Sequence, residues 1–150
     1  MELQTEQLKL IPCTEELINK IEPGEYEPGP HIYAYLEGLK KDPSQYGWGV
    51  WFVIEKITNR IIGDMGFKGK PQAETVEIGY RIIPEAQNRG YATEAANELI
   101  KWAFSFAEVT KILAECEADN HASIRVLEKL QMQRTGQEGK LLKWEMSKRN

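Results

Sequence analysis

The turn Gln87-Asn88-Arg89-Gly90-Tyr91-Ala92 carries the strongest chemical signal in the sequence. It follows an apolar strand pattern and Pro84, and it precedes a long helical pattern. A glycine at such a turn allows several backbone N–H groups to converge at the positive end of a helix dipole, which suits a phosphate or pyrophosphate. Arg89 would add a formal charge and a forked set of donors. The segment therefore predicts a site for a phosphorylated ligand.

A glycine before a helix has a simpler explanation as well. Many turns between a strand and a helix need glycine for backbone geometry and bind nothing. The chain has no Gly-x-x-x-x-Gly-Lys-Ser/Thr loop and no Gly-x-Gly-x-x-Gly loop followed by an acid. Their absence argues against an ordinary nucleotide-binding domain.

The strand before this turn has one polar and one apolar face. Glu77, Gly79 and Arg81 alternate with four apolar or aromatic residues, and alternate side chains of a strand share a face. Gly79 leaves room for a ligand to approach the polar face. Glu77, a carboxylate on this polar face, is a candidate general base, with an ion pair to a cross-strand lysine such as Lys68 as its alternative role.

Three blocks of the sequence resemble one enzyme family. The run Gln87-x-x-Gly90-x-Ala92, preceded by Glu77-Ile78-Gly79-Tyr80, resembles the acetyl-CoA signature of the GCN5-related N-acetyltransferases (GNAT). The segment 120–130 resembles the C-terminal helix of that family. Residues 3–12 resemble its RimJ/RimL-like branch, which acetylates ribosomal protein N-termini. The resemblance implies one N-acetyltransferase domain over residues 1–150, with acetyl-CoA as co-substrate.

The resemblance also implies how acetyl-CoA is held. The backbone of the strand end would pair with the pantetheine arm as an added strand, and the N–H groups of the turn would hold the pyrophosphate. Gln87 would orient the loop, while Asn120 would contact the pantetheine arm or cap the next helix, a role that suits asparagine. The expected cofactor-binding residues are Arg81, Ile82, Ile83, Gln87, Asn88, Arg89, Gly90, Tyr91, Ala92, Thr93 and Asn120.

Two positions depart from the family pattern. Many members have a tyrosine seven residues after the asparagine, where it protonates the leaving thiolate, and this chain has Leu127. The proton would then come from Ser123 or from a water. This departure keeps open a non-catalytic acyl-CoA-binding or sensing protein as the alternative function. Gln131 stands where a glycine usually makes the left-handed turn after the helix, so we expect a different turn there.

Composition narrows the class of protein further. The chain of 150 residues is 41% hydrophobic and 28% charged, with a formal net charge of −4. The acidic balance argues against nucleic acid as a partner, and no apolar run approaches the roughly 20 residues that span a membrane. Two cysteines and two histidines show no metal-ligand spacing. We expect a cytoplasmic protein without a metal, whose acceptor is a peptide N-terminus, a polyamine, an aminoglycoside-like compound or another small amine.

The periodicity of the sequence predicts an α+β (mixed α/β) fold. Helices are expected after Thr14 and over residues 31–41, 93–106 and 123–130, and strands over 6–12 (an edge strand), 48–56, 60–68, 76–82, 111–117 and twice within 131–148, joined near 136–139. This order implies a mixed, mostly antiparallel twisted sheet with helices on both faces. An exposed edge strand near the C-terminus would support a homodimer.

Overall fold

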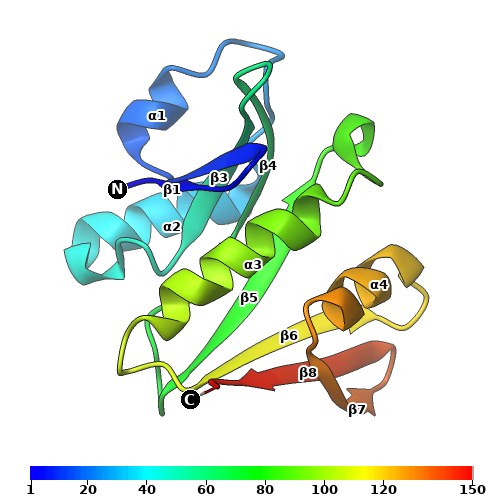
Figure 1. Ribbon diagram of the computed structural model, residues 1–150. Coiled ribbons are helices and arrows are strands. Elements are labelled where there is room, and N and C mark those ends of the chain that lie inside the picture. Colours follow the sequence, from blue (N-terminus) through cyan, green and yellow to red (C-terminus); the bar gives the residue numbers. More distant parts are fainter. Residues whose placement is uncertain (150) are drawn as a thin grey trace.

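A computed structural model describes residues 1–149 and contains one eight-stranded sheet, in the order β1-β2-β3-β4-β5-β6-β8-β7 (Figure 1). The strands are β1 Leu3–Gln4, β2 Leu8–Pro12, β3 Val50–Glu55, β4 Arg60–Phe67, β5 Thr75–Ile82, β6 Lys111–Glu117, β7 Gln133–Glu138 and β8 Leu141–Ser147. The helices are α1 Glu15–Asn19, α2 Pro30–Lys41, α3 Tyr91–Phe104 and α4 His121–Lys129. Within residues 1–149 only β5 and β6 pair in parallel. The predicted α+β class is confirmed.

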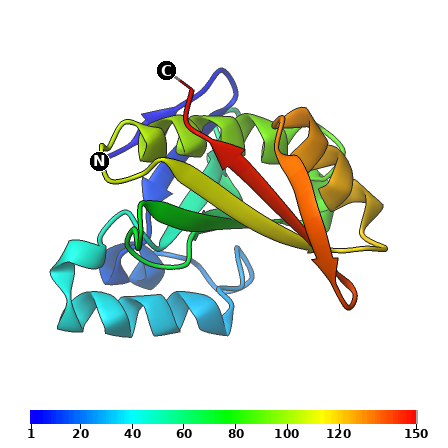
Figure 2. The same ribbon diagram turned by 90° about the horizontal axis from the view of Figure 1, so that it is seen from below.

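Helices cover both faces of the sheet (Figure 2). On one face, α3 buries Ala95, Ala96 and Leu99 in the larger hydrophobic core. On the other face, α2 buries Ile32 and Leu36 in a smaller core, to which α1 also contributes. None of the helices in the described part of the chain is long and apolar enough to cross a membrane.

The parallel pair β5 and β6 opens the sheet. The two strands pair only over Thr75–Glu77 and Lys111–Leu113, and then diverge toward α4 (Figure 1). Beyond that point the edge of β5 that faces β6 has no neighbouring strand among the described residues, so most of its backbone groups are available to a ligand.

Helix α1 begins at its expected cap residue, whereas α3 and α4 begin earlier than predicted. Thr14 caps α1, since its hydroxyl accepts a hydrogen bond from the Leu17 N–H at 3.2 Å. The helices α3 and α4 each begin two residues earlier than predicted, at Tyr91 and His121. Residues 91 and 92, expected in the turn, therefore belong to the first turn of α3.

Two local expectations are wrong, and a third holds at a shifted position. Residues 6–12 are not at the edge, because β1 pairs with β2 through Leu3 and Gln4. The last two strands join at residues 139–140, at the end of the predicted region, since Gly136 lies inside β7 beside a register shift. The turn after α4 keeps its left-handed residue although Gln131 is not glycine: its φ is 67°, and the Met132 N–H donates to the Leu127 carbonyl at 3.1 Å. This bond satisfies a carbonyl at the helix end and offsets the backbone strain.

Candidate active site

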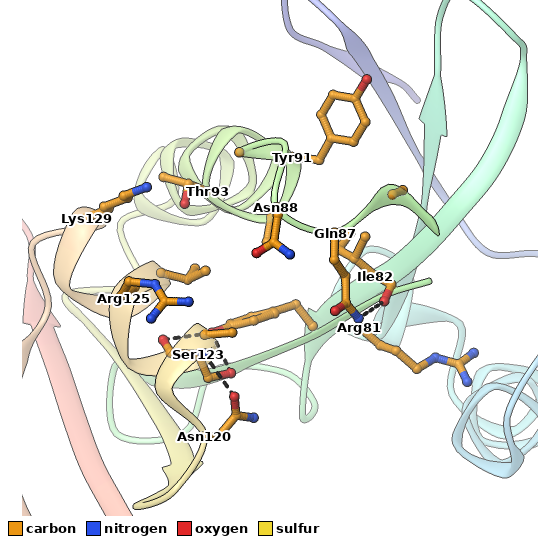
Figure 3. Close-up of a pocket in the computed structure, with 16 residues that line it drawn as sticks. Arg81, Ile82, Gln87, Asn88, Tyr91, Thr93, Asn120, Ser123, Arg125 and Lys129 are labelled. Carbon is orange, nitrogen blue, oxygen red and sulfur yellow. Dashed lines mark hydrogen bonds between the residues drawn. The ribbon is translucent and has the colours of Figure 1, made fainter. Parts of the chain in front are cut away.

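A cavity of about 390 Å³ lies where β5 and β6 diverge, between the N-terminus of α3 and the helix α4 (Figure 3). Most of the predicted site residues line it. They are Arg81, Ile82, Gln87, Asn88, Gly90, Tyr91, Ala92, Thr93, Asn120 and Ser123. The structure thus brings together residues from β5, the following loop, α3 and α4, whereas Glu77, Ile83 and Arg89 do not line this cavity.

The loop before α3 presents backbone donors to the cavity. Asn88 and Gly90 both have left-handed backbones, with φ of 63° and 77°. Gly90 is the N-cap of α3, and no side chain in the described part of the chain caps this helix. The first N–H groups of α3 therefore remain free, beside a loop whose alternating backbone can form an anion-binding concavity.

The charged side chains on the cavity differ from the sequence prediction. Arg89 points elsewhere, with Nη1 at 3.6 Å from Glu55 Oε2. Glu55 is buried, and hydrogen bonds from Tyr91 and Thr58 lower its pKa, so its carboxylate attracts the arginine. Arg125 and Lys129 of α4 line the cavity instead (Figure 3). Their spacing of four residues on a predicted helix was the signal that they share a face.

Alternate residues of β5 direct their backbone groups to opposite sides, and this decides which of them can pair with a ligand. The Ile83 N–H donates to the Ile62 carbonyl at 2.8 Å, and the Glu77 carbonyl accepts from the Lys68 N–H at 3.0 Å. Odd-numbered residues of β5 therefore turn their backbone toward β4. The N–H of Ile83 is therefore already paired, and the backbone groups of Arg81 face β4. The backbone groups of Tyr80 and Ile82 face the opening between β5 and β6.

Polar side chains make hydrogen bonds at the two ends of this opening. Gln87 Nε2 donates to the Ile82 carbonyl at 2.9 Å and ties the loop to the end of β5. Asn120 Oδ1 accepts from the Ser123 N–H at 3.1 Å, so Asn120 caps α4 while it lines the cavity (Figure 3). Leu127, at the position of the missing tyrosine, is fully buried in the core.

A second cavity, of about 630 Å³, lies on the other face of β5, against α2. Tyr80 and Arg81 border both cavities. The walls of the second cavity are mainly apolar, including Trp48 and Phe67, and Gly79 leaves open space there. Its size and position suit an acceptor that approaches the first cavity across the strand.

A buried acid that the sequence analysis missed lies in this second cavity. Asp64 of β4 is 4% exposed and accepts hydrogen bonds from Tyr26 at 2.5 Å and Arg81 at 3.0 Å. His31 Nε2 is 2.8 Å from its other oxygen. Burial and the neighbouring carboxylate raise the pKa of Tyr26. The signal in the sequence was a lone acid within the apolar segment 60–67.

The carboxylate of Glu77 is engaged in an ion pair. Its Oε2 is 2.5 Å from Lys68 Nζ, so the ion pair expected as the alternative role of Glu77 is present. Glu77 lines neither cavity. Lys68 itself lines the second cavity. Within residues 1–149, no group of three or more His, Cys, Asp or Glu side chains is arranged to hold a metal ion.

The sequence matches a known family over most of this fold. A family model described as "Acetyltransferase (GNAT) domain" matches residues 8–133. The chain belongs to the GNAT acetyltransferase family. One relative of this GNAT chain is YjdG, an uncharacterized N-acetyltransferase of Bacillus subtilis, 38% identical over 100 residues, which are 66% of this chain and 60% of YjdG. Other curated relatives match over about half of their length.

Solved structures share the GNAT fold along the whole chain. RimL, a ribosomal L7/L12 α-N-protein acetyltransferase solved with coenzyme A, matches with a TM-score of 0.76 at 15% identity, over 98% of both chains. The ribosomal-protein-S5-alanine acetyltransferase of Vibrio fischeri matches with a TM-score of 0.74 at 17% identity, over 98% of this chain and 96% of that one. At these identities the similarity shows the fold alone.

Proposed function

We propose that this GNAT chain is an acetyl-CoA-dependent N-acetyltransferase, which transfers the acetyl group to a primary amine by direct attack on the thioester. The observation that carries the proposal is one continuous cavity, which joins the unpaired edge of β5 to the uncapped N-terminus of α3. The first part suits an extended amide chain and the second part suits a pyrophosphate.

The residues present fit acetyl-CoA, which supplies the activated acetyl group when bound. The N–H groups from Asn88 to Thr93 would hold the pyrophosphate, with Arg125 and Lys129 adding positive charge. The backbone groups of Tyr80 and the N–H of Ile82 would pair with the pantetheine amides, since the Ile82 carbonyl already accepts from Gln87. Asn120 borders the same cavity and would contact this arm.

The second cavity would receive the acceptor amine. Glu77 is the proposed general base, and it would act through a water because it borders neither cavity. Ser123, on the first cavity, would supply the proton to the thiolate directly or through its hydrogen-bond partner. Structural neighbours named as ribosomal-protein acetyltransferases favour a protein N-terminus as the acceptor, with a small amine as the second option.

Three properties of the proposed enzyme stay predictions: one functional domain over residues 1–150, a cytoplasmic location and a homodimer. The edge strand β7 is exposed along its whole length, which leaves it free to pair with a second copy.

Calorimetric titration with acetyl-CoA, with ATP as the control ligand, tests the proposal. Saturable binding of acetyl-CoA alone is expected, followed by release of free thiol when a panel of peptides and small amines is added. Binding without thiol release for any amine would favour an acyl-CoA sensor. No binding at millimolar acetyl-CoA would overturn the proposal.

A further inference from the structure

Tyr80 occupies the opening between β5 and β6, three residues beyond the last paired residue of β5. Its hydroxyl donates a hydrogen bond to Ser123 Oγ at 3.2 Å, and it lies 3.4 Å from the Ser123 carbonyl. Tyr80 is also one of two residues that border both cavities. A phenol therefore stands at the junction where an acyl donor and an amine would meet.

Other acids near the first cavity are less well placed. The Tyr91 hydroxyl is bound to Glu55 at 2.7 Å, and Glu55 does not line the cavity. Lys129 lies six residues beyond Ser123 on α4, about 9 Å along the helix axis. The serine hydroxyl is a far weaker acid than a phenol, whose ordinary pKa is about 10.

The environment of Tyr80 keeps its hydroxyl protonated. Burial raises its pKa above the ordinary value, and the hydrogen bond with Ser123 acts in the opposite direction. At neutral pH the side chain is thus a neutral donor. Because two hydroxyl groups can exchange donor and acceptor roles, Tyr80 can turn its proton toward a ligand while Ser123 donates to the phenol oxygen.

We propose that Tyr80 is the catalytic acid of this site and protonates the leaving thiolate, and that Ser123 relays the replacement proton. The inference rests on the proposed acetyltransferase function. The amine nitrogen forms the bond to the carbonyl carbon, the C–S bond breaks, and its electron pair leaves with sulfur. Tyr80 gives its proton to that sulfur, and the phenolate regains one from solvent through Ser123. The amine has released one proton to the base, so no proton is gained or lost overall.

A pair of ligands isolates the contact between Tyr80 and sulfur. CoA and desulfo-CoA, which lacks the thiol, are titrated into the wild-type protein and Tyr80→Phe across the pH range in which the thiol ionises. In the wild type, CoA should gain affinity over desulfo-CoA as pH rises, on the order of tenfold, because a hydrogen bond to an ionised acceptor favours the thiolate. Tyr80→Phe should lose this gain and keep its affinity for desulfo-CoA.

Turnover gives a second readout. Tyr80→Phe should lower kcat by roughly a hundredfold with little change in the KM for acetyl-CoA. Tyr33→Phe is the control, since Tyr33 is exposed on α2 and borders neither cavity. Phenylalanine retains the ring, so the packing around position 80 is preserved.

The outcomes separate the two proposals. If Tyr80→Phe keeps the pH-dependent preference for CoA, or lowers the affinity for CoA and desulfo-CoA equally, Tyr80 is structural and this inference is wrong. If the wild-type protein binds neither CoA nor desulfo-CoA, the proposed function itself is wrong, and the role of Tyr80 with it.

Discussion

His31 Nε2 lies 2.8 Å from Asp64 Oδ1, and this contact ties α2 to β4 at the second cavity. The other carboxylate oxygen of Asp64 accepts hydrogen bonds from Tyr26, in the loop before α2, and from Arg81 of β5. A single buried carboxylate therefore holds together four segments, and three of them, α2, β4 and β5, border the proposed acceptor site. Removing its charge would leave Arg81 without a buried partner.

Asp64→Asn should lower the free energy of unfolding by about 3 kcal/mol, because one partner of a buried charged cluster is lost while the others remain. Urea unfolding followed by fluorescence measures the change. Glu16→Gln is the control, since Glu16 pairs with Lys20 on an exposed helix face and should leave the midpoint nearly unchanged. Equal effects of the two substitutions would contradict the structural role of Asp64.

Gly90→Asp should weaken acetyl-CoA binding about a hundredfold, because it places a negative charge beside the expected pyrophosphate. Gly90 has a left-handed backbone, so any side chain also adds strain. Gly139→Asp is the matched control: Gly139 is also left-handed, meets no neighbouring atom and lies in the β7–β8 turn. Calorimetry should show normal affinity for Gly139→Asp. Unchanged affinity in a folded Gly90→Asp variant would refute the site.

Gly79→Val should raise the KM for the acceptor amine roughly tenfold and leave acetyl-CoA binding intact. A Cβ at position 79 meets no protein atom within 4 Å, so a valine there has room to project into the second cavity. Valine also suits a strand, so the fold should tolerate it. Gly136→Val tests the same change in β7, away from both cavities, and should leave both parameters unchanged. A normal acceptor KM in Gly79→Val would place the acceptor elsewhere.

The elements and the turn before α3 follow from local sequence signals. The glycine turn before α3, the cap Thr14 and the alternation along 76–82 depend on neighbours close in the chain, and each is found within two residues of its expected place. Side-chain direction across elements could not be predicted in this way. Arg89 turns to Glu55, 34 residues earlier, while Arg125 and Lys129 reach the cavity because α4 packs against α3. The Asp64 cluster likewise forms only after the sheet assembles.

Glu77→Gln should lower turnover at neutral pH roughly a hundredfold and leave acetyl-CoA binding nearly unchanged, if Glu77 accepts the amine proton through a water. Its ion pair with Lys68 supplies the competing explanation, in which the substitution only loosens two strands. Lys68→Met separates the two roles, since it breaks the ion pair and keeps the carboxylate. Turnover lost equally in both variants, or retained in Glu77→Gln, would remove Glu77 from the mechanism.

Cys13 should make the stability of the protein fall in alkali. Its side chain is fully buried, and burial, reinforced by Asp64, raises the pKa of the thiol to about 12. The thiol of the unfolded chain ionises near pH 8.5. The contribution of the protonated Cys13 thiol to the free energy of unfolding is therefore present in full below about pH 8.5 and is lost as pH rises toward about 12. The wild type should lose up to about 1.4 kcal/mol per pH unit more than Cys13→Ala in that range, the limit for one proton. Urea unfolding at several pH values from 7 to about 10 measures the difference. Parallel pH profiles for the two proteins would mean that this thiol ionises as freely in the folded chain as in the unfolded one.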